Sequence, residues 1–172
     1  MKILGAVLAA AAVLALLPGM ALAEAQIKWT QFQPADAGYR IEFPGKPTVK
    51  RDTLPSRAGP APHLEAKLAS GGYSYSVELT TYASASDPEA VLDLFSSAFT
   101  KEGKVLAQAR LKVGPDVARR LEIEMKEGQV VATMLVVTDG TRVYQVLCIS
   151  LKGNEHSPNV EHFVNSFALV QQ

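Results

Sequence analysis

The stretch from Val117 to Leu151 constrains the fold most, because it predicts three consecutive antiparallel strands. Its last two segments, 130–138 and 142–151, are apolar at almost every position. Such strands are buried on both faces, so we expect helices to cover the second side of the sheet there. The first segment, 117–126, alternates apolar with charged residues, which predicts one buried face and one solvent-facing face.

Two glycine-containing turns are expected to join these three strands. Asp139-Gly140 suits a type I′ turn, which needs positive φ at both central residues. Glu127-Gly128 suits the same turn less well, because glutamate rarely adopts positive φ.

Alternating and helical patterns extend the prediction to the rest of the chain. Further strands are expected at 27–32, 39–43, 64–68, 73–80 and 105–113. Apolar residues at helical spacing predict one helix that ends near Glu102, with Gly103 as a left-handed stop, and a second that begins at Ser157-Pro158.

Two start signals compete at the first helix. Either Ser86 and Glu89 form a capping box, or Asp87 caps the helix with Pro88 at its first position. Both alternatives place the helix start within one residue, so the element itself does not depend on the choice.

The N-terminus carries the pattern of a secretory signal peptide. A short basic start is followed by the apolar run Ile3–Leu17, the helix breaker Pro18-Gly19 and the small residues of Ala21-Leu22-Ala23. This order predicts cleavage after Ala23, so that 1–23 is a signal peptide and 24–172 forms one exported domain. The alternative, an uncleaved anchor, requires about 20 apolar residues, and the run is shorter.

The cysteine and charge content narrows the location and the partners. No cysteine follows the apolar run, so there is no thiol for a lipid, and we expect a periplasmic or secreted protein. The chain has 17 basic and 17 acidic residues, and this balance argues against nucleic acid as a partner. Cys148 is the only cysteine, and its apolar strand favours a small buried hydrophobe over a reactive nucleophile.

The segment 44–62 holds five prolines and is expected to be the least structured part of the domain. Four basic residues face one aspartate in it, and they are the candidate partner-binding residues: Lys46, Lys50, Arg51 and Arg57. A mobile basic loop of this kind could bind an anionic surface. Alternatively, the segment is a solvated connection in which prolines and lysines keep edge strands from aggregating.

Motifs for catalysis, phosphate binding or paired-cysteine chemistry are absent from the sequence, and no cofactor is expected. His156 and His162 could approach a metal with nearby glutamates, but their spacing does not place them on one helix face, so no metal site is predicted. Glu122 and Glu124 share a strand face, where an acid-base pair competes with the simpler interpretation of cross-paired surface charges.

Tyr73 and Tyr75 lie two residues apart on the strand expected at 73–80, so they share one of its faces. They could form a platform for ligand stacking. The polar residues on the opposite face of this strand favour packing in the core instead.

Four segments together resemble exported bacterial proteins of the Mog1/PsbP/DcrB-like superfamily: residues 38–47, the Gly114-Pro115 turn, the strand with Tyr144, and residues 163–167. The resemblance implies an α+β fold, a single α/β sandwich with an antiparallel sheet of about six or more strands flanked by helices. Members of this superfamily bind unrelated partners, among them a small nuclear GTPase and a lumenal photosystem. Many bacterial members look like lipoproteins, and this chain differs from them in lacking the cysteine.

Two functions remain open from the sequence. The favoured one is a noncatalytic binding or accessory protein of the bacterial cell envelope, a monomer without a transmembrane segment in its mature chain, whose partner is an envelope protein or an anionic surface. The alternative is a small envelope hydrolase or metal-dependent enzyme whose site residues are scattered along the sequence. A pocket with converging titratable groups would favour the enzyme, and a shallow surface would favour the binding protein.

Overall fold

The computed structural model describes residues 27–170, so the predicted signal peptide lies outside the described residues. The described chain contains ten strands, two α-helices and one 3-10 turn. In chain order they are β1 (Thr30–Phe32), β2 (Tyr39–Phe43), β3 (Thr48–Leu54), β4 (Ala61–Ser70), β5 (Tyr73–Thr81), α1 (Pro88–Thr100), β6 (Lys104–Val113), β7 (Asp116–Met125), η1 (Lys126–Gly128), β8 (Val130–Thr138), β9 (Arg142–Leu151), α2 (Pro158–Asn165) and β10 (Ala168–Leu169).

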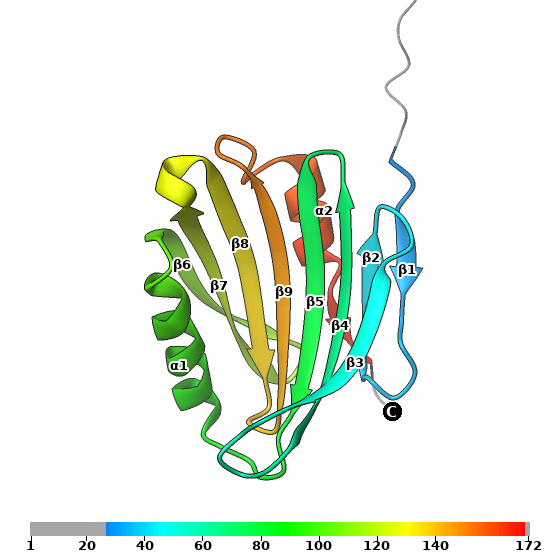
Figure 1. Cartoon of the computed structure of the whole chain (residues 1–172), viewed down its shortest axis with the longest axis vertical. Coiled ribbons are helices and arrows are strands. Elements are labelled where there is room, and N and C mark those ends of the chain that lie inside the picture. The colour runs from blue at the N-terminus through cyan, green and yellow to red at the C-terminus, as the bar shows by residue number, and fades with distance from the viewer. Residues whose placement is uncertain (1–26, 171–172) are drawn as a thin grey trace, which may run out of the picture.

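The strands form two antiparallel sheets. Seven of them make a large sheet in the order β3-β4-β5-β9-β8-β7-β6, and β1-β2-β10 make a small one. Helix α1 packs on β7 and β8, whereas α2 packs against β9, β8 and the small sheet on the other side (Figure 1). The expected α+β sandwich is therefore confirmed, including helices over both faces of the apolar strands. Neither helix in the described residues has the length and apolar character that a bilayer crossing needs.

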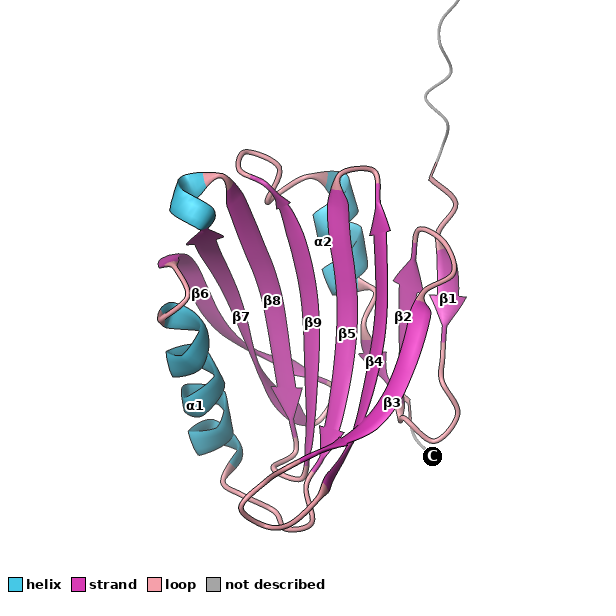
Figure 2. Cartoon of the chain, viewed as in Figure 1, coloured by secondary structure: helices cyan, strands magenta, loops and turns pink. Residues whose placement is uncertain are grey.

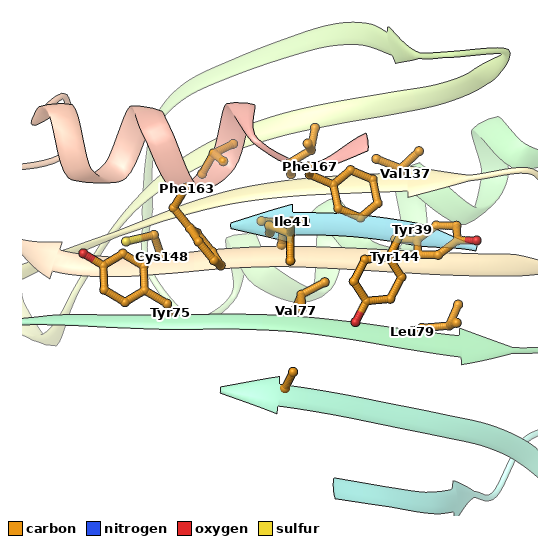
Figure 3. Packing of buried hydrophobic residues seen from close by; sticks show 14 of the residues in the cluster. Tyr39, Ile41, Tyr75, Val77, Leu79, Val137, Tyr144, Cys148, Phe163 and Phe167 are labelled. Atoms are coloured by element: carbon orange, nitrogen blue, oxygen red, sulfur yellow. The ribbon is translucent and has the colours of Figure 1, made fainter. Parts of the chain in front are cut away.

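The main core lies between the large sheet and the layer formed by α2 and the small sheet. Its largest fully buried side chains are aromatic: Tyr39, Phe43, Tyr75, Tyr144 and Phe163. They come from distant strands and meet edge to face, as with Phe163 and Tyr75 at a centroid distance of 5.0 Å (Figure 3). Because Tyr75 also stacks on Tyr73, the tyrosine pair belongs to this core rather than to a ligand platform.

The strand β7 differs from its prediction, because its charged face is not solvent-facing. Glu122 is only 7% exposed, and Arg120 beside it is half-buried. Helix α2 covers this face and places Glu161 against Arg120, with N–O distances of 3.0 and 2.5 Å. The alternation in the sequence thus reflects paired charges under a helix, not a face in water.

The backbone conformations of the two predicted turns are the reverse of those expected. Glu127 and Gly128 both have positive φ, at 55° and 86°, as a type I′ turn requires. In the other turn only Gly140 does, at 92°, so the expected type I′ turn at Asp139-Gly140 is wrong. The Asp139 carboxylate accepts hydrogen bonds from the backbone N–H groups of Thr141 and Arg142, and this side-chain turn replaces the backbone one.

The first helix begins as one of its two start signals indicates, since Asp87 is the N-cap and accepts a hydrogen bond from the Ala90 N–H at 3.3 Å. Gly103, however, is not a left-handed stop, because its φ is not positive. A Cβ at position 103 would lie 2.1 Å from the carbonyl oxygen of Glu124. The glycine is therefore required for close approach of two backbones, not for its turn.

The segment 44–62 is not the unstructured loop that its prolines suggest. Its centre is β3, which pairs with β4 in an unbroken register from Thr48 opposite Lys67 to Leu54 opposite Ala61. Pro47 and Pro55 stand immediately outside the strand, where the missing N–H does not interrupt the ladder. Pro47 and Pro55 therefore flank the edge strand instead of preventing it, and Pro62 lies within β4, opposite Thr53.

Candidate functional site

The four predicted partner-binding residues lie along the free edge of the large sheet. Lys50 and Arg51 are in β3, Lys46 precedes it, and Arg57 follows it in a turn. Lys50 and Arg51 are consecutive in the strand, so they point to opposite faces of the sheet. The four cations line an edge from end to end rather than converging on one point.

Only one of these four cations has an ion-pair partner within residues 27–170. The Lys50 ammonium lies 2.6 Å from the Asp52 carboxylate, and this hydrogen bond raises the pKa of Lys50 and lowers that of Asp52. Lys46, Arg51 and Arg57 therefore leave a net positive charge along the edge.

Arg51 lies beside the rim of the main core. It lines a hollow of about 220 Å³ together with Asp36 and Ala37 of the loop before β2. The buried Tyr39 hydroxyl has no hydrogen-bond partner among the described residues. Burial raises the pKa of Tyr39, and the charge of Arg51 acts in the opposite direction, so the arginine is close enough to affect the rim electrostatically.

An open groove of about 630 Å³ lies between α2 and the outer face of the small sheet. Its polar side chains include Arg40, Glu42, His162, Asn165 and Ser166. The sequence did not indicate this groove, because β2 and α2 lie far apart along the chain and each contributes only isolated polar positions on its outer side.

Serine, histidine and glutamate meet in this groove, but not as an activated nucleophile. The Ser166 hydroxyl donates to the Phe163 carbonyl at 2.8 Å and accepts from the Glu42 N–H at 3.0 Å. His162 Nε2 lies 2.6 Å from Glu42 Oε2 instead of the serine. A nucleophilic serine needs its proton held by a base, so this arrangement fastens β2 to α2 and does not prepare a reaction.

The remaining charges of the groove are paired, with one exception. Glu161 accepts from Arg120 and from the Asn165 amide, and the Arg120 hydrogen bond lowers the pKa of Glu161. Arg40 is exposed and has no ion pair among residues 27–170. The groove is therefore polar and close to neutral.

The sole tryptophan joins the N-terminal strand region to α2. Trp29 stacks on His162 with ring centroids 4.2 Å apart, and its edge meets Tyr75 at 5.9 Å. His162 thus contacts both an aromatic ring and a carboxylate, and its role is to dock the small sheet.

The other residues considered for chemistry do not form a site. The His63 ring lies 3.0 Å from the Thr80 hydroxyl, far along the fold from His162. In the part of the chain that the structure describes, no group of three or more His, Cys, Asp or Glu side chains could hold a metal ion. Cys148 is buried in the main core, and this burial raises the pKa of its thiol to about 12, which disfavours the reactive thiolate.

The paired glutamates of β7 are cross-paired charges. Glu122 contacts Arg120 at 3.3 Å, and Glu124 is bonded to Lys152, which lowers the pKa of Glu124. Each carboxylate has its own cation, so the two do not share a proton as an acid-base pair would.

A buried arginine on the opposite side of β7 escaped the sequence analysis. The Arg119 side chain is 3% exposed and lies under α1, 2.7 Å from Asp93, 3.0 Å from the Ser96 hydroxyl and 3.3 Å from Glu89. Strand alternation places Arg119 on the face of Leu121 and Ile123, opposite to Arg120, but the sequence does not show which side chains of α1 surround it there. The cluster ties α1 to the sheet.

Comparison with known proteins places the fold. No family model and no curated protein matches the chain. Among solved structures, cyanobacterial PsbP (CyanoP) from Synechocystis sp. PCC 6803 matches with a TM-score of 0.57 and 10% sequence identity, over 91% of this chain and 98% of that one. A protein of unknown function from Pseudomonas aeruginosa, PA94, matches with a TM-score of 0.40 and 15% identity, over 74% of this chain and 85% of its own, which is too weak to support a conclusion.

The class of the molecule is thus an α+β sandwich built on a seven-stranded antiparallel sheet. More particularly, its fold is PsbP-like, as the resemblance in the sequence implied. At 10% identity this likeness concerns the fold alone.

Proposed function

We propose that this chain is an exported, noncatalytic binding or accessory protein of the bacterial cell envelope, and that it binds an anionic partner through the basic edge of β3. The observation that carries the proposal is the exposure of that edge. Six of the seven residues of β3 are exposed, and the strand and its flanks carry Lys46, Lys50, Arg51 and Arg57 against a single aspartate.

Exposed charges of this kind act over a limited distance. At physiological ionic strength the Debye length is about 8 Å, so several cations along one strand attract an anionic surface without any buried contact. Such binding weakens as salt rises. A partner bound through the aromatic core or the groove would respond much less to salt.

The noncatalytic part of the proposal rests on the groove beside α2. The Ser166 hydroxyl donates its hydrogen bond to the Phe163 carbonyl, and His162 contacts the Glu42 carboxylate. Neither group is available to a substrate in this arrangement. Replacing Ser166 by alanine is therefore expected to leave partner binding unchanged.

The test of binding compares two fourfold variants in affinity capture from envelope extract across a salt series. The first replaces Lys46, Lys50, Arg51 and Arg57 by glutamine. The matched control replaces four cations on the opposite side of the sheet, Lys101, Lys104, Arg110 and Lys112, and so removes the same charge. We expect the first variant to lose partners at lower salt than the parent, whereas the control keeps them.

Retention of the same partners by the first variant, with the salt dependence of the parent, would exclude the β3 edge. Thermal melts of both variants serve as the folding check, because all eight side chains are exposed and their loss should leave the melting temperature nearly unchanged.

Export has a separate test. If the predicted signal peptide is removed after Ala23, the intact mass of the protein in the envelope fraction corresponds to a chain that begins at Glu24. A mass that still includes residues 1–23 would contradict cleavage, and recovery from the cytoplasm alone would contradict export.

A further inference from the structure

The free edge of β3 has the geometry to accept another strand. We infer that the partner binds there by strand addition: an extended acidic segment of another protein pairs with β3 as an eighth strand of the large sheet. The inference rests on the proposed function, which it deepens by naming the conformation of the partner as well as its charge.

The first observation is the regularity of β3. It is the terminal strand of the sheet, and its pairing with β4 runs without a shift over the full seven residues (Figure 2). Its outer backbone groups therefore form an unbroken row with no neighbouring strand in the described chain. At the opposite margin, the pairing of β6 with β7 shifts between Val105 and Ala107 and is regular from Ala107 to Val113, so only the start of that row is interrupted.

The second observation is the exposure of apolar side chains along this edge. Val49 is 44% exposed and Leu54 is 39% exposed, although both lie in an ordered strand. Alternation places Val49 and Arg51 on one face of the sheet and Lys50 and Leu54 on the other. A strand added here would cover an apolar side chain and meet a cation on each face.

Net charge favours an acidic segment over a second copy of β3 as the added strand. A second copy paired antiparallel about Arg51 would set the two Arg51 side chains opposite each other, which is unfavourable, although it would also set each Lys50 opposite an Asp52. An acidic strand places carboxylates beside the same cations. Backbone hydrogen bonds then supply affinity, and the flanking charges supply selectivity.

The probe for the test is a synthetic peptide, acetylated and amidated, of sequence Thr-Val-Glu-Glu-Val-Val-Thr, whose two glutamates point to opposite faces of an extended strand. It is titrated into the isotopically labelled mature protein, with binding read from backbone amide shifts. The matched control peptide has the same sequence with alternate backbone nitrogens methylated, so that its charge and side chains stay while its donors on one edge are lost.

Strand addition predicts that amide shifts concentrate in residues 48–54 and that methylation weakens binding about tenfold or more. It also predicts slower hydrogen exchange of the outward N–H groups of β3 in the complex. Equal binding of both peptides, or shifts centred on the groove beside α2, would overturn strand addition.

The fourfold glutamine variant of the β3 edge separates this inference from the proposed function. If the variant loses the peptide and methylation has no effect, the edge binds anions but not strands, and only the inference fails. If the variant binds the peptide as the parent does, the proposal that the basic edge of β3 binds an anionic partner is wrong. Sedimentation of the protein alone gives a further outcome, since a dimer abolished by Lys50→Pro would assign the edge to a second copy and overturn the acidic partner.

Discussion

The two ends of the large sheet are built differently on the same face. At the β7 and β8 end, α1 covers the face and buries Leu92 among Leu121, Ile123, Met134 and Val136. At the β4 and β5 end no helix of residues 27–170 lies over this face (Figure 2). Strand alternation places polar side chains such as Ser76 and Glu78 on it. Both ends contribute to the main core on the other face, where β7 supplies Ala118 beside its paired charges, and they differ most in whether a helix covers the first face.

This difference teaches how one sheet can supply both stability and a binding edge. Strands covered on both sides are held by two packed layers, because their apolar side chains are buried on each face. Strands covered on one side tolerate an exposed margin. The anchored end thus allows the other end to keep β3 unprotected by a helix.

The largest loss of stability is expected from removing a buried side chain at the end of the sheet that α1 covers. Replacing Ile123 by alanine removes a side chain that is 1% exposed under α1, and we expect a loss of about 2 to 5 kcal/mol in the free energy of unfolding. Ser76→Ala on the open end of the same face should stay within about 0.5 kcal/mol. Denaturant melts measure both. Equal effects would mean that the two ends are covered alike.

A smaller effect is expected from loosening the attachment of α1. Asp93 provides the shortest contact of the buried Arg119 guanidinium, at 2.7 Å. Asp93→Ala leaves that charge short of one partner, and we expect a loss of about 1 to 3 kcal/mol in thermal or denaturant melts. Leu94→Ala is the matched control on the same helix, because Leu94 is 68% exposed. A similar loss in the control would show that helix propensity, not the arginine, is responsible.

The smallest effect concerns pH at the open end. Burial raises the pKa of Glu78 above its ordinary value of 4.5, and Glu65 directly opposite raises it further. The folded state therefore holds its proton more tightly than the unfolded state, so this group lowers stability as pH rises above about 4.5. Glu78→Gln should gain stability over the parent as pH increases from 4 to 7.

The control for this pH series is Ser76→Ala, two residues from Glu78 on the same face of β5, because it removes no titratable group. It should shift the melting temperature by the same small amount at every pH. If the difference between Glu78→Gln and the parent does not change with pH, the raised pKa is not supported.

Much of this comparison was visible in the sequence. The apolar strands β8 and β9 required cover on both faces, and the alternating residues of β4 and β5 required it on one. Of the two start signals considered for the first helix, the structure uses Asp87, and the second helix begins at Ser157-Pro158 as predicted, because helix starts depend on a few adjacent residues. The fold could therefore be predicted where local pattern and burial agree.

The failures have one physical cause, which is that a residue's environment is set by elements remote in the chain. Arg119 and Arg120 differ only in which helix each one meets. The sequence predicted only a short extended segment after Pro47 within a poorly structured stretch, whereas the structure has a seven-residue strand, β3, that pairs with β4 along its whole length. The groove of Glu42 and His162 joins β2 to α2 across most of the chain, so no local motif could have revealed it.

The stacking of Trp29 on His162 has a practical consequence. Residue 29 is the only tryptophan, so the ultraviolet emission of the chain excited at its red edge comes from one indole, lying against an imidazole and near the edge of Tyr75. An imidazolium quenches indole fluorescence more strongly than a neutral imidazole. The fluorescence intensity of Trp29 therefore reports whether the N-terminal strand region contacts α2, and release of that region can be followed without attaching a dye.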